Sequence, residues 1–157
     1  MPVGCSGLAQ AEPAYSGFMV ELSEKDIDRT VEAATSARGR AWAPYSGYAV
    51  GAAIRDADGC VHVGCNVENA SYGLSVCAER HAVAAAIAAG ARVFSAVAVV
   101  TDSSPPASPC GACRQVLAEF GDFPVVLANL AGERRITSVG ELLPNAFGSN
   151  ALVNGQE

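Results

Sequence analysis

The sequence carries little charge and few aromatic residues. Of its 157 residues, 17% are charged and 6% are aromatic, whereas 50% are hydrophobic. It has no run of about 18 consecutive apolar residues, the length that a membrane-spanning helix requires. Its start, MPVGCSGLAQ, lacks the basic flank and the apolar stretch of a secretion signal. These absences argue against a membrane-embedded or secreted protein, and we expect a cytoplasmic one.

Positive charge is scarce as well. Ten Lys and Arg residues face sixteen Asp and Glu residues, which gives a formal charge of -6 and an isoelectric point of about 4.8. A protein that binds a polynucleotide or an anionic membrane surface needs many basic side chains to contact phosphates. We therefore expect neither nucleic acid nor a membrane among the partners.

The length suits one domain with its own core. We expect a flexible N-terminal extension over residues 1–22, one folded domain over residues 23–148 and a C-terminal tail over residues 149–157. The mean hydropathy of +0.24 is high for a free-standing domain of this size. This excess predicts that part of the surface is buried between subunits.

Hydrophobic periodicity and turn residues predict alternating helices and strands. Ser23 and Asp26 have the spacing of a helix-capping box, and Gly90 ends an alanine-rich helix that is apolar around most of its girth and is therefore expected to be centrally buried. The order indicates an α/β fold, a three-layer αβα sandwich with a mixed central sheet of about five strands. The predicted helices span residues 23–42, 77–89, 110–121 and 138–144, and the predicted strands span residues 48–55, 60–67, 94–100 and 124–128, with a small extra strand at 133–137.

Two short motifs each begin a predicted helix that follows a β segment. One is Cys-x-Glu at Cys77 and Glu79, and the other is Pro-Cys-x-x-Cys, with its cysteines at Cys110 and Cys113. A catalytic zinc ion needs three protein ligands and one open tetrahedral position for water. Two helix starts that face each other provide three thiolates, with Glu79 beside the metal as a proton carrier. Coupled in this way, the motifs have the spacing typical of zinc deaminases.

Three thiolates give the zinc site a net negative charge, which would weaken the metal as a Lewis acid. The positive ends of the two helix dipoles oppose this charge. Arg80 and Arg114 each follow a key residue directly, and we expect Arg80 above all to hydrogen-bond the sulfurs of the metal ligands.

Two other interpretations of these residues stay open. The three cysteines could be small core residues, with Glu79 an ordinary acid in the first turn of a helix. Alternatively, Cys60 or Cys65 could add a fourth thiolate and complete a purely structural zinc site, which would leave Glu79 without a task.

At these residues the chain resembles the homotetrameric zinc-dependent cytidine deaminase family. The resemblance spans roughly residues 24–148 and implies that residues 23–148 are the catalytic domain. It implies hydrolytic deamination of cytidine and deoxycytidine to the uridines with release of ammonia, with one Zn²⁺ per chain. The matching stretches are APYSGYAVGAA (43–53), GCNVENASYG (64–73), CAER (77–80), SPCGACRQV (108–116) and ELLPNAF (141–147).

The resemblance also implies roles for residues that bind the substrate. Asn66 and Glu68 would hold the ribose hydroxyls, and the main chain at Ala78 would contact the pyrimidine carbonyl. Tyr48 stands where the family commonly has a Phe that stacks near the base. Phe147 matches an aromatic residue that reaches into the site of a neighbouring subunit, so the resemblance implies a homotetramer with shared sites.

Three rival functions remain. A blasticidin S deaminase shares both short motifs, but the segment NVENASY fits ribose binding better. A deaminase of nucleotides or nucleic acid is disfavoured by the acidic charge and by the carboxylate at Glu68. A zinc-stabilised binding module without catalysis would place four protein thiolates on the metal.

Overall fold

The computed structural model describes residues 22–149 and residue 151. Within them the chain alternates between helices and strands, as the periodicity predicts. The helices are α1 (Glu24–Arg38), α2 (Ala78–Ala88), α3 (Gly111–Ala118) and α4 (Val139–Leu142), with a 3₁₀ turn η1 (Tyr72–Leu74). The strands are β1 (Gly51–Asp56), β2 (Val61–Cys65), β3 (Phe94–Thr101), β4 (Pro124–Asn129) and β5 (Arg134–Ser138).

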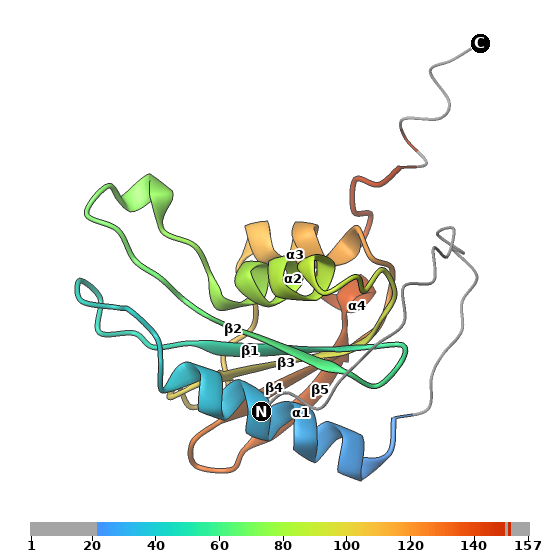
Figure 1. The fold of residues 1–157 in the computed structure, drawn as a ribbon, viewed down its shortest axis with the longest axis horizontal. Coiled ribbons are helices and arrows are strands. Elements are labelled where there is room, and N and C mark those ends of the chain that lie inside the picture. The colour runs from blue at the N-terminus through green and yellow to red at the C-terminus, as the bar shows by residue number, and fades with distance from the viewer. Residues whose placement is uncertain (1–21, 150, 152–157) are drawn as a thin grey trace.

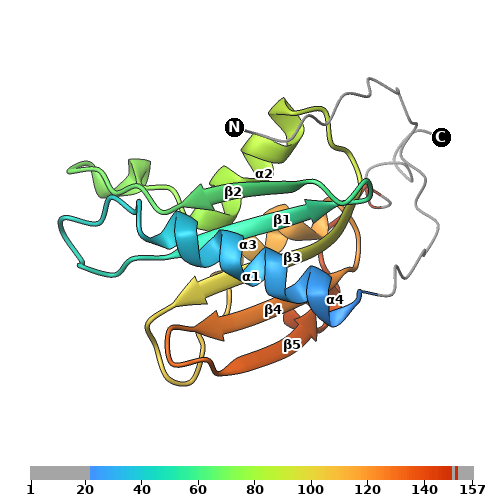
Figure 2. The same ribbon diagram turned by 60° about the horizontal axis from the view of Figure 1, so that its bottom comes forward.

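The five strands form one sheet in the order β2-β1-β3-β4-β5 (Figure 2). β3 and β4 are parallel, and the other neighbouring pairs are antiparallel. The crossover from β3 to β4 contains α3, so the loop that leaves the end of β3 leads directly into this helix. The mixed sheet of five strands confirms the predicted fold class.

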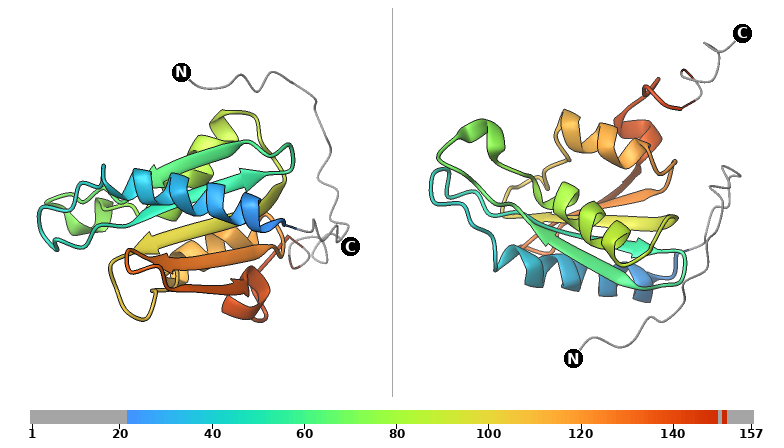
Figure 3. Two further views of the ribbon diagram at one scale, coloured as in Figure 1. Left: turned by 90° about the horizontal axis from the view of Figure 1, so that it is seen from below. Right: turned by 45° about the horizontal axis from the view of Figure 1, so that its top comes forward.

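Helices cover both faces of the sheet. α1 lies across one face, and α2 and α3 lie side by side on the other (Figures 1 and 3). Strand side chains alternate between the two resulting cores, as the two-residue period of a strand requires. Val97 and Val99 of β3 pack with Ala82 of α2 in one core, whereas Ala98 and Val100 pack toward α1 in the other.

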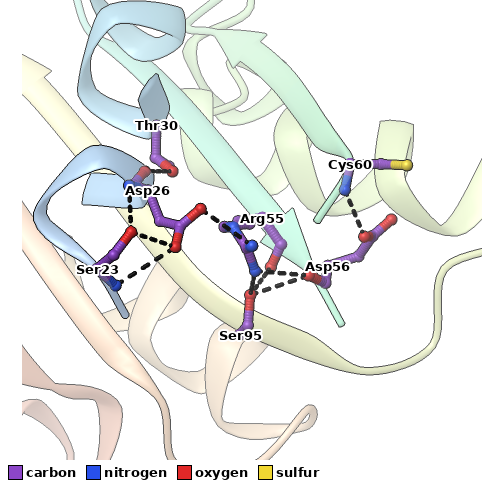
Figure 4. A network of polar contacts seen from close by, with 7 residues as sticks. All are labelled: Ser23, Asp26, Thr30, Arg55, Asp56, Cys60 and Ser95. Atoms are coloured by element: carbon purple, nitrogen blue, oxygen red, sulfur yellow. Dashed lines mark hydrogen bonds and ion pairs between the residues drawn. The ribbon is translucent and has the colours of Figure 1, made fainter. Parts of the chain in front are cut away.

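A polar network ties the start of α1 to the ends of β1 and β3 (Figure 4). Ser23 and Asp26 form the predicted capping box, and Asp26 also accepts a hydrogen bond of 3.1 Å from Arg55. The guanidinium of Arg55 donates a second bond of 3.0 Å to Ser95 Oγ. The side chain of one helix-capping residue therefore fixes how α1 lies on the sheet.

The predicted boundaries at the first helix and first strand are wrong, and tertiary pairing explains both. α1 ends at Arg38 because Trp42 leaves the helix and bridges Val67, with its N–H donating to Asn66 O at 3.0 Å. The strand predicted from residue 48 begins at Gly51, because the N–H of Val50 donates to the side chain of Asn66 instead of to a neighbouring strand.

The prediction that the alanine-rich helix is centrally buried is wrong for the single chain. α2 lies in an outer layer, so it buries one side, which includes Ala78, Ala82 and Ala86, and exposes Ala84 and Ala88.

The predicted N-terminal extension (residues 1–22) and C-terminal tail (residues 149–157) lie almost wholly outside the described residues. Among the residues that the structure does describe, no helix has both the length and the apolar character needed to cross a bilayer.

Candidate active site

The structure brings the three predicted metal ligands together at two helix starts. Cys77 is the N-cap of α2, Cys110 is the N-cap of α3, and Cys113 lies in the first turn of α3. Their sulfur atoms all lie within 4.8 Å of one another. Cys77 does not use its side chain to cap its own helix, so its sulfur remains available to the common centre.

The spacing of these sulfurs fits a zinc ion. Zn–S bonds of about 2.3 Å in a tetrahedral arrangement place two sulfurs about 3.8 Å apart. Sγ of Cys77 and Sγ of Cys110 are separated by 3.8 Å. Three cysteine sulfurs within 4.8 Å of one another are a soft donor set that suits Zn²⁺.

A fourth thiolate does not join this group in the described part of the chain. The cluster of potential ligands found there contains only Cys77, Cys110 and Cys113. Cys65 instead directs its sulfur to Arg40 O at 3.5 Å, and Cys60 lies at the turn between β1 and β2. Three ligands leave a tetrahedral ion with one open position, which is the arrangement of a catalytic site.

The three thiols are not equivalent before a cation binds. Burial raises the pKa of Cys77 and, more strongly, that of Cys113. Burial also acts on Cys110, but hydrogen bonds from the backbone and side chain of Cys113 outweigh it and lower the pKa of Cys110. The more exposed ligand at the helix start is therefore the one that ionises most readily.

Glu79 lies beside this cluster and is only 4% exposed. It stands in the first turn of α2, two residues after Cys77. Burial raises the pKa of its carboxyl group, although its own backbone N–H and Cys113 oppose the shift. Within the described residues it forms no ion pair shorter than 4.0 Å. A buried carboxyl group with a raised pKa can both take and release a proton near neutral pH.

A cavity of about 320 Å³ opens onto these residues. Its size lies at the lower end of the range for sites that bind small molecules. The lining includes Glu79 with Cys77 and Cys110, and it combines them with apolar side chains, neutral polar side chains and the carboxylate of Glu68. The other lining residues are Ser46, Tyr48, Val50, Asn66, Glu68, Ala78, Val99, Thr101, Ala107 and Ser108.

Asn66 and Glu68 line the cavity, but both also hold the loop at residues 43–50. The Asn66 amide accepts from the N–H of Val50 and donates to Tyr48 O, each at 2.8 Å. Glu68 accepts bonds from the N–H groups of Tyr45 and Ser46 and from the Ser46 hydroxyl. The Ser46 hydroxyl and these N–H groups lower the pKa of Glu68, so its carboxylate stays charged at the edge of the cavity.

The other residues expected to bind substrate divide into two groups. Ala78 and Tyr48 line the cavity. Phe147 does not: its ring is 63% exposed, and its backbone carbonyl accepts a bond of 2.8 Å from Gln115 in α3. Within one chain, the structure leaves Phe147 outside the cavity.

Arg80 and Arg114 take different places around the cluster. Arg80 donates to Ser75 O at 3.2 Å, and its Nε is buried with no hydrogen-bond partner among the described residues. We predicted hydrogen bonds from Arg80 to the cysteine sulfurs. Among the described residues, Arg80 forms none of them. Arg114 instead makes three bonds, to Pro109 O, Ser108 Oγ and Leu142 O, and so joins the loop before Cys110 to the end of α4.

Sequence reasoning missed several polar residues of the cavity. Ser46, Thr101 and Ser108 contribute to its wall, and Ser103 accompanies them through its contact with Tyr48. Ser46 lies within the APYSGY stretch and Ser108 within the SPCGACRQV stretch, which were the available signals. Thr101 ends β3 and Ser103 lies in the loop after it, and no local pattern marks either residue.

Comparison with known proteins agrees with this geometry. Residues 23–129 match the family model described as the cytidine and deoxycytidylate deaminase zinc-binding region. A cytidine deaminase of Sporosarcina psychrophila is 47% identical over 129 residues, which cover 81% of this chain and 95% of that protein. The crystal structure of a cytidine deaminase from Burkholderia pseudomallei superposes with a TM-score of 0.74 at 55% identity, covering 76% of this chain and 98% of that one.

A weaker similarity is to an enzyme named for a different substrate. A blasticidin-S deaminase of Bacillus cereus is 29% identical over 109 residues, which cover 64% of this chain and 78% of that protein. The higher identities and the fuller coverage all fall on cytidine deaminases. With its cysteine cluster, its buried glutamate and its αβα fold, this chain belongs to the family of zinc-binding cytidine and deoxycytidylate deaminases.

Proposed function

We propose that this protein is a zinc-dependent cytidine deaminase that hydrolyses cytidine and deoxycytidine to uridine and deoxyuridine and releases ammonia. One observation carries the proposal. A single cavity is lined both by Cys77 and Cys110 of the cysteine cluster with the buried Glu79, and by the polar side chains of Asn66 and Glu68. A nucleoside combines a reactive ring with sugar hydroxyl groups, and these two sets of side chains suit its two parts.

Cys77, Cys110 and Cys113 would hold one zinc ion per chain, which supplies Lewis-acid chemistry and lowers the pKa of a bound water. Glu79 performs the proton transfers. One of its carboxylate oxygens takes the proton from the attacking water and delivers it to N3 of the cytosine ring as C4 is attacked. It then carries a second proton, taken from the hydroxyl group now on C4, to the amino group, which leaves as ammonia as the C4 carbonyl forms.

The rest of the cavity orients the nucleoside. The ring of Tyr48 stacks near the base, and the backbone at Ala78 contacts the pyrimidine carbonyl. The amide of Asn66 and the carboxylate of Glu68 bind the ribose hydroxyls, and Glu68 acts as an acceptor only. The charged carboxylate of Glu68 repels a phosphate group, so we expect 5′-phosphates and cytosine in polynucleotides to be poor substrates.

Arg80 acts at longer range. Its guanidinium is close enough to lower the pKa of Glu79, although burial of Glu79 has the larger and opposite effect. We assign to Arg80 the task of offsetting part of the negative charge that three thiolates bring to the site.

We further propose a homotetramer with sites shared between subunits. Two neighbouring loops, residues 43–50 and 66–76, project beyond the end of the sheet (Figures 1 and 3). They expose Tyr45 and Tyr72, whose rings meet with centroids 5.8 Å apart, and Leu74. Exposed apolar groups of this size are typical of subunit interfaces. Phe147, which stays outside its own cavity, would complete a site of a neighbouring subunit.

The catalytic domain is assigned to residues 23–148, with a flexible extension before it and a short tail after it. We propose a cytoplasmic location, in which a reducing environment keeps the free thiols of Cys77, Cys110 and Cys113 available to a metal. Its acidic charge supports a small-molecule substrate with no nucleic acid or membrane partner.

The test follows the ultraviolet absorbance of cytidine with purified, zinc-loaded protein. Cytidine and deoxycytidine are expected to be converted. Cytidine 5′-monophosphate, cytosine in single-stranded DNA and blasticidin S complete the panel as poor substrates. Faster turnover of blasticidin S or of the monophosphate would reassign the substrate. Zinc bound at stoichiometry without turnover of any compound would support a binding module instead.

A further inference from the structure

A hydrogen bond beside the cavity joins two loops that are far apart in the sequence. The hydroxyl of Tyr48 lies 2.6 Å from Oγ of Ser103, a residue 55 positions away. Tyr48 belongs to the loop before β1, and Ser103 to the segment after β3. Both loops contribute lining residues, Ser46 and Tyr48 from the first and Ala107 and Ser108 from the second.

Ser103 is firmly held on the side away from Tyr48. Its hydroxyl donates to Thr101 Oγ1 at 3.3 Å, and its carbonyl accepts from Asn129 Nδ2 at 3.0 Å. Thr101 and Asn129 are buried and pair with each other at the ends of the parallel strands β3 and β4. Either hydroxyl can be the donor in the bond between Tyr48 and Ser103.

The Tyr48 ring needs such an anchor. Its backbone is fixed, since Asn66 Nδ2 donates to its carbonyl and its N–H donates to Ser46 Oγ. The residue is nevertheless 43% exposed, so packing alone covers little more than half of it. The distal hydroxyl ties the far end of the ring to the rigid end of the sheet.

We propose that the bond between Tyr48 and Ser103 is a tether that holds the aromatic ring in its substrate-stacking position before the nucleoside enters. This inference rests on the proposed function and makes Ser103 a positioning residue, one that acts through Tyr48 without touching the substrate. Preorganisation of a contact group lowers the cost of binding without altering the chemical step. The tether therefore affects substrate binding and leaves proton transfer at Glu79 alone.

The experiment compares Tyr48→Phe, Ser103→Ala and the double variant in the zinc-loaded protein. Each single change is expected to raise KM for cytidine about threefold to tenfold, the range for one net hydrogen bond, while kcat stays within about twofold, as for interactions made equally in ground and transition states. The double variant is expected to lose no more than either single one. Tyr72→Phe is the matched control, because it removes a tyrosine hydroxyl from the neighbouring projecting loop and keeps the ring.

Two results would overturn the tether. One is a Tyr48→Phe variant with the KM of the unaltered protein. The other is a double variant whose loss is the product of the two single losses, because independent effects multiply. A fall in kcat with unchanged KM would count against it in the same way.

A second measurement separates this proposal from the proposed function. Urea unfolding of the unaltered protein, Tyr48→Phe, Ser103→Ala and the double variant gives a double-mutant cycle that needs no substrate. We expect this cycle to show coupling between Tyr48 and Ser103 in the free energy of unfolding. If the unaltered protein converts no cytidine while this coupling persists, the function is wrong and the hydrogen bond is real. If cytidine is converted but neither cycle shows coupling, the tether alone is wrong.

Discussion

Glu79 combines deep burial with a position beside three thiol groups. A carboxylate is rarely buried without a charged partner, because desolvation is costly, and this one forms no close ion pair within the described residues. Such a position is unfavourable for the fold alone and suits a group that exchanges protons with a ligand. The structure thus argues against an ordinary first-turn helix acid.

Glu79→Gln is expected to lower kcat for cytidine by about three to four orders of magnitude, because an amide hydrogen-bonds but does not shuttle protons. Zinc content, measured by atomic absorption, is expected to stay at one per chain, since no ligand is removed. Near-normal turnover in this variant would rule out the proton-transfer role.

Cys113 is fully buried at the centre of the cluster, and its loss leaves two thiolates. Cys113→Ala is therefore expected to abolish stoichiometric zinc, whereas Cys65→Ala, which removes a sulfur directed to Arg40 O, is expected to retain it. Metal analysis after gel filtration checks both. The opposite pattern, with zinc lost only in Cys65→Ala, would show that the ligand set is wrong.

Single residues differed in how far the sequence could predict them. Cys77, Glu79, Cys110 and Cys113 lie within short motifs at helix starts, so local spacing was enough to propose that they meet. Ser46 and Ser103 act through contacts with residues 22 and 55 positions away. Such contacts depend on how distant loops meet, which no local period encodes.

At the scale of elements, close packing against β2 sets the position of α2, the helix that carries Glu79. Gly64 in β2 packs so closely that an added Cβ would lie 2.4 Å from Ala78 O and 2.4 Å from Ala82 N. Both atoms belong to the backbone of α2 and cannot rotate away. Any side chain at Gly64 would therefore push the helix that carries Glu79 off the sheet.

Gly64→Ala is expected to destabilise the protein by about 3 kcal/mol, in the range for overpacking a rigid contact, and to lower kcat for cytidine because Glu79 shifts. The matched control is Gly73→Ala, where no atom lies within 4 Å of the added Cβ and the backbone is not left-handed. Urea unfolding measures both. Equal stability of the two variants would mean that α2 adapts freely.

The elements themselves were largely predictable, because the helices have an apolar period and the strands are alternating segments or short apolar runs bounded by turn residues. The boundaries were wrong where a segment distant in the sequence pairs with the backbone. Trp42 continues the helical pattern, but its backbone pairs with Asn66 and Glu68, so α1 ends earlier. The apolar girth of α2 predicted central burial because composition does not distinguish a core helix from one that leaves an apolar side exposed.

At the scale of the whole molecule, a single chain exposes apolar side chains to solvent, where their exposure does not stabilise a monomer. Ala84 and Ala88 of α2 are exposed, as are the rings of Trp42 and Phe147. Obligate interfaces resemble divided cores, and closed symmetry is the usual outcome. These surfaces support the proposed tetramer.

Phe147→Ala is expected to raise KM for cytidine about tenfold with unchanged zinc content, because it removes an apolar wall and no metal ligand. Light scattering is expected to give four times the chain mass of 15.9 kDa. A fully active species of one chain mass at high dilution would show that each chain carries a complete site.

The placement of the cysteines also has a consequence for how the protein folds. Cys110 and Cys113 are one helical turn apart, so an unfolded chain already offers them as a local pair. Cys77 lies 33 residues before Cys110, and the whole of β3 lies between them. Closing that loop carries an entropic cost, which native strand pairing offsets. Tight metal capture is therefore a late event in folding, and a chain that holds zinc firmly has already inserted the middle strand of its sheet.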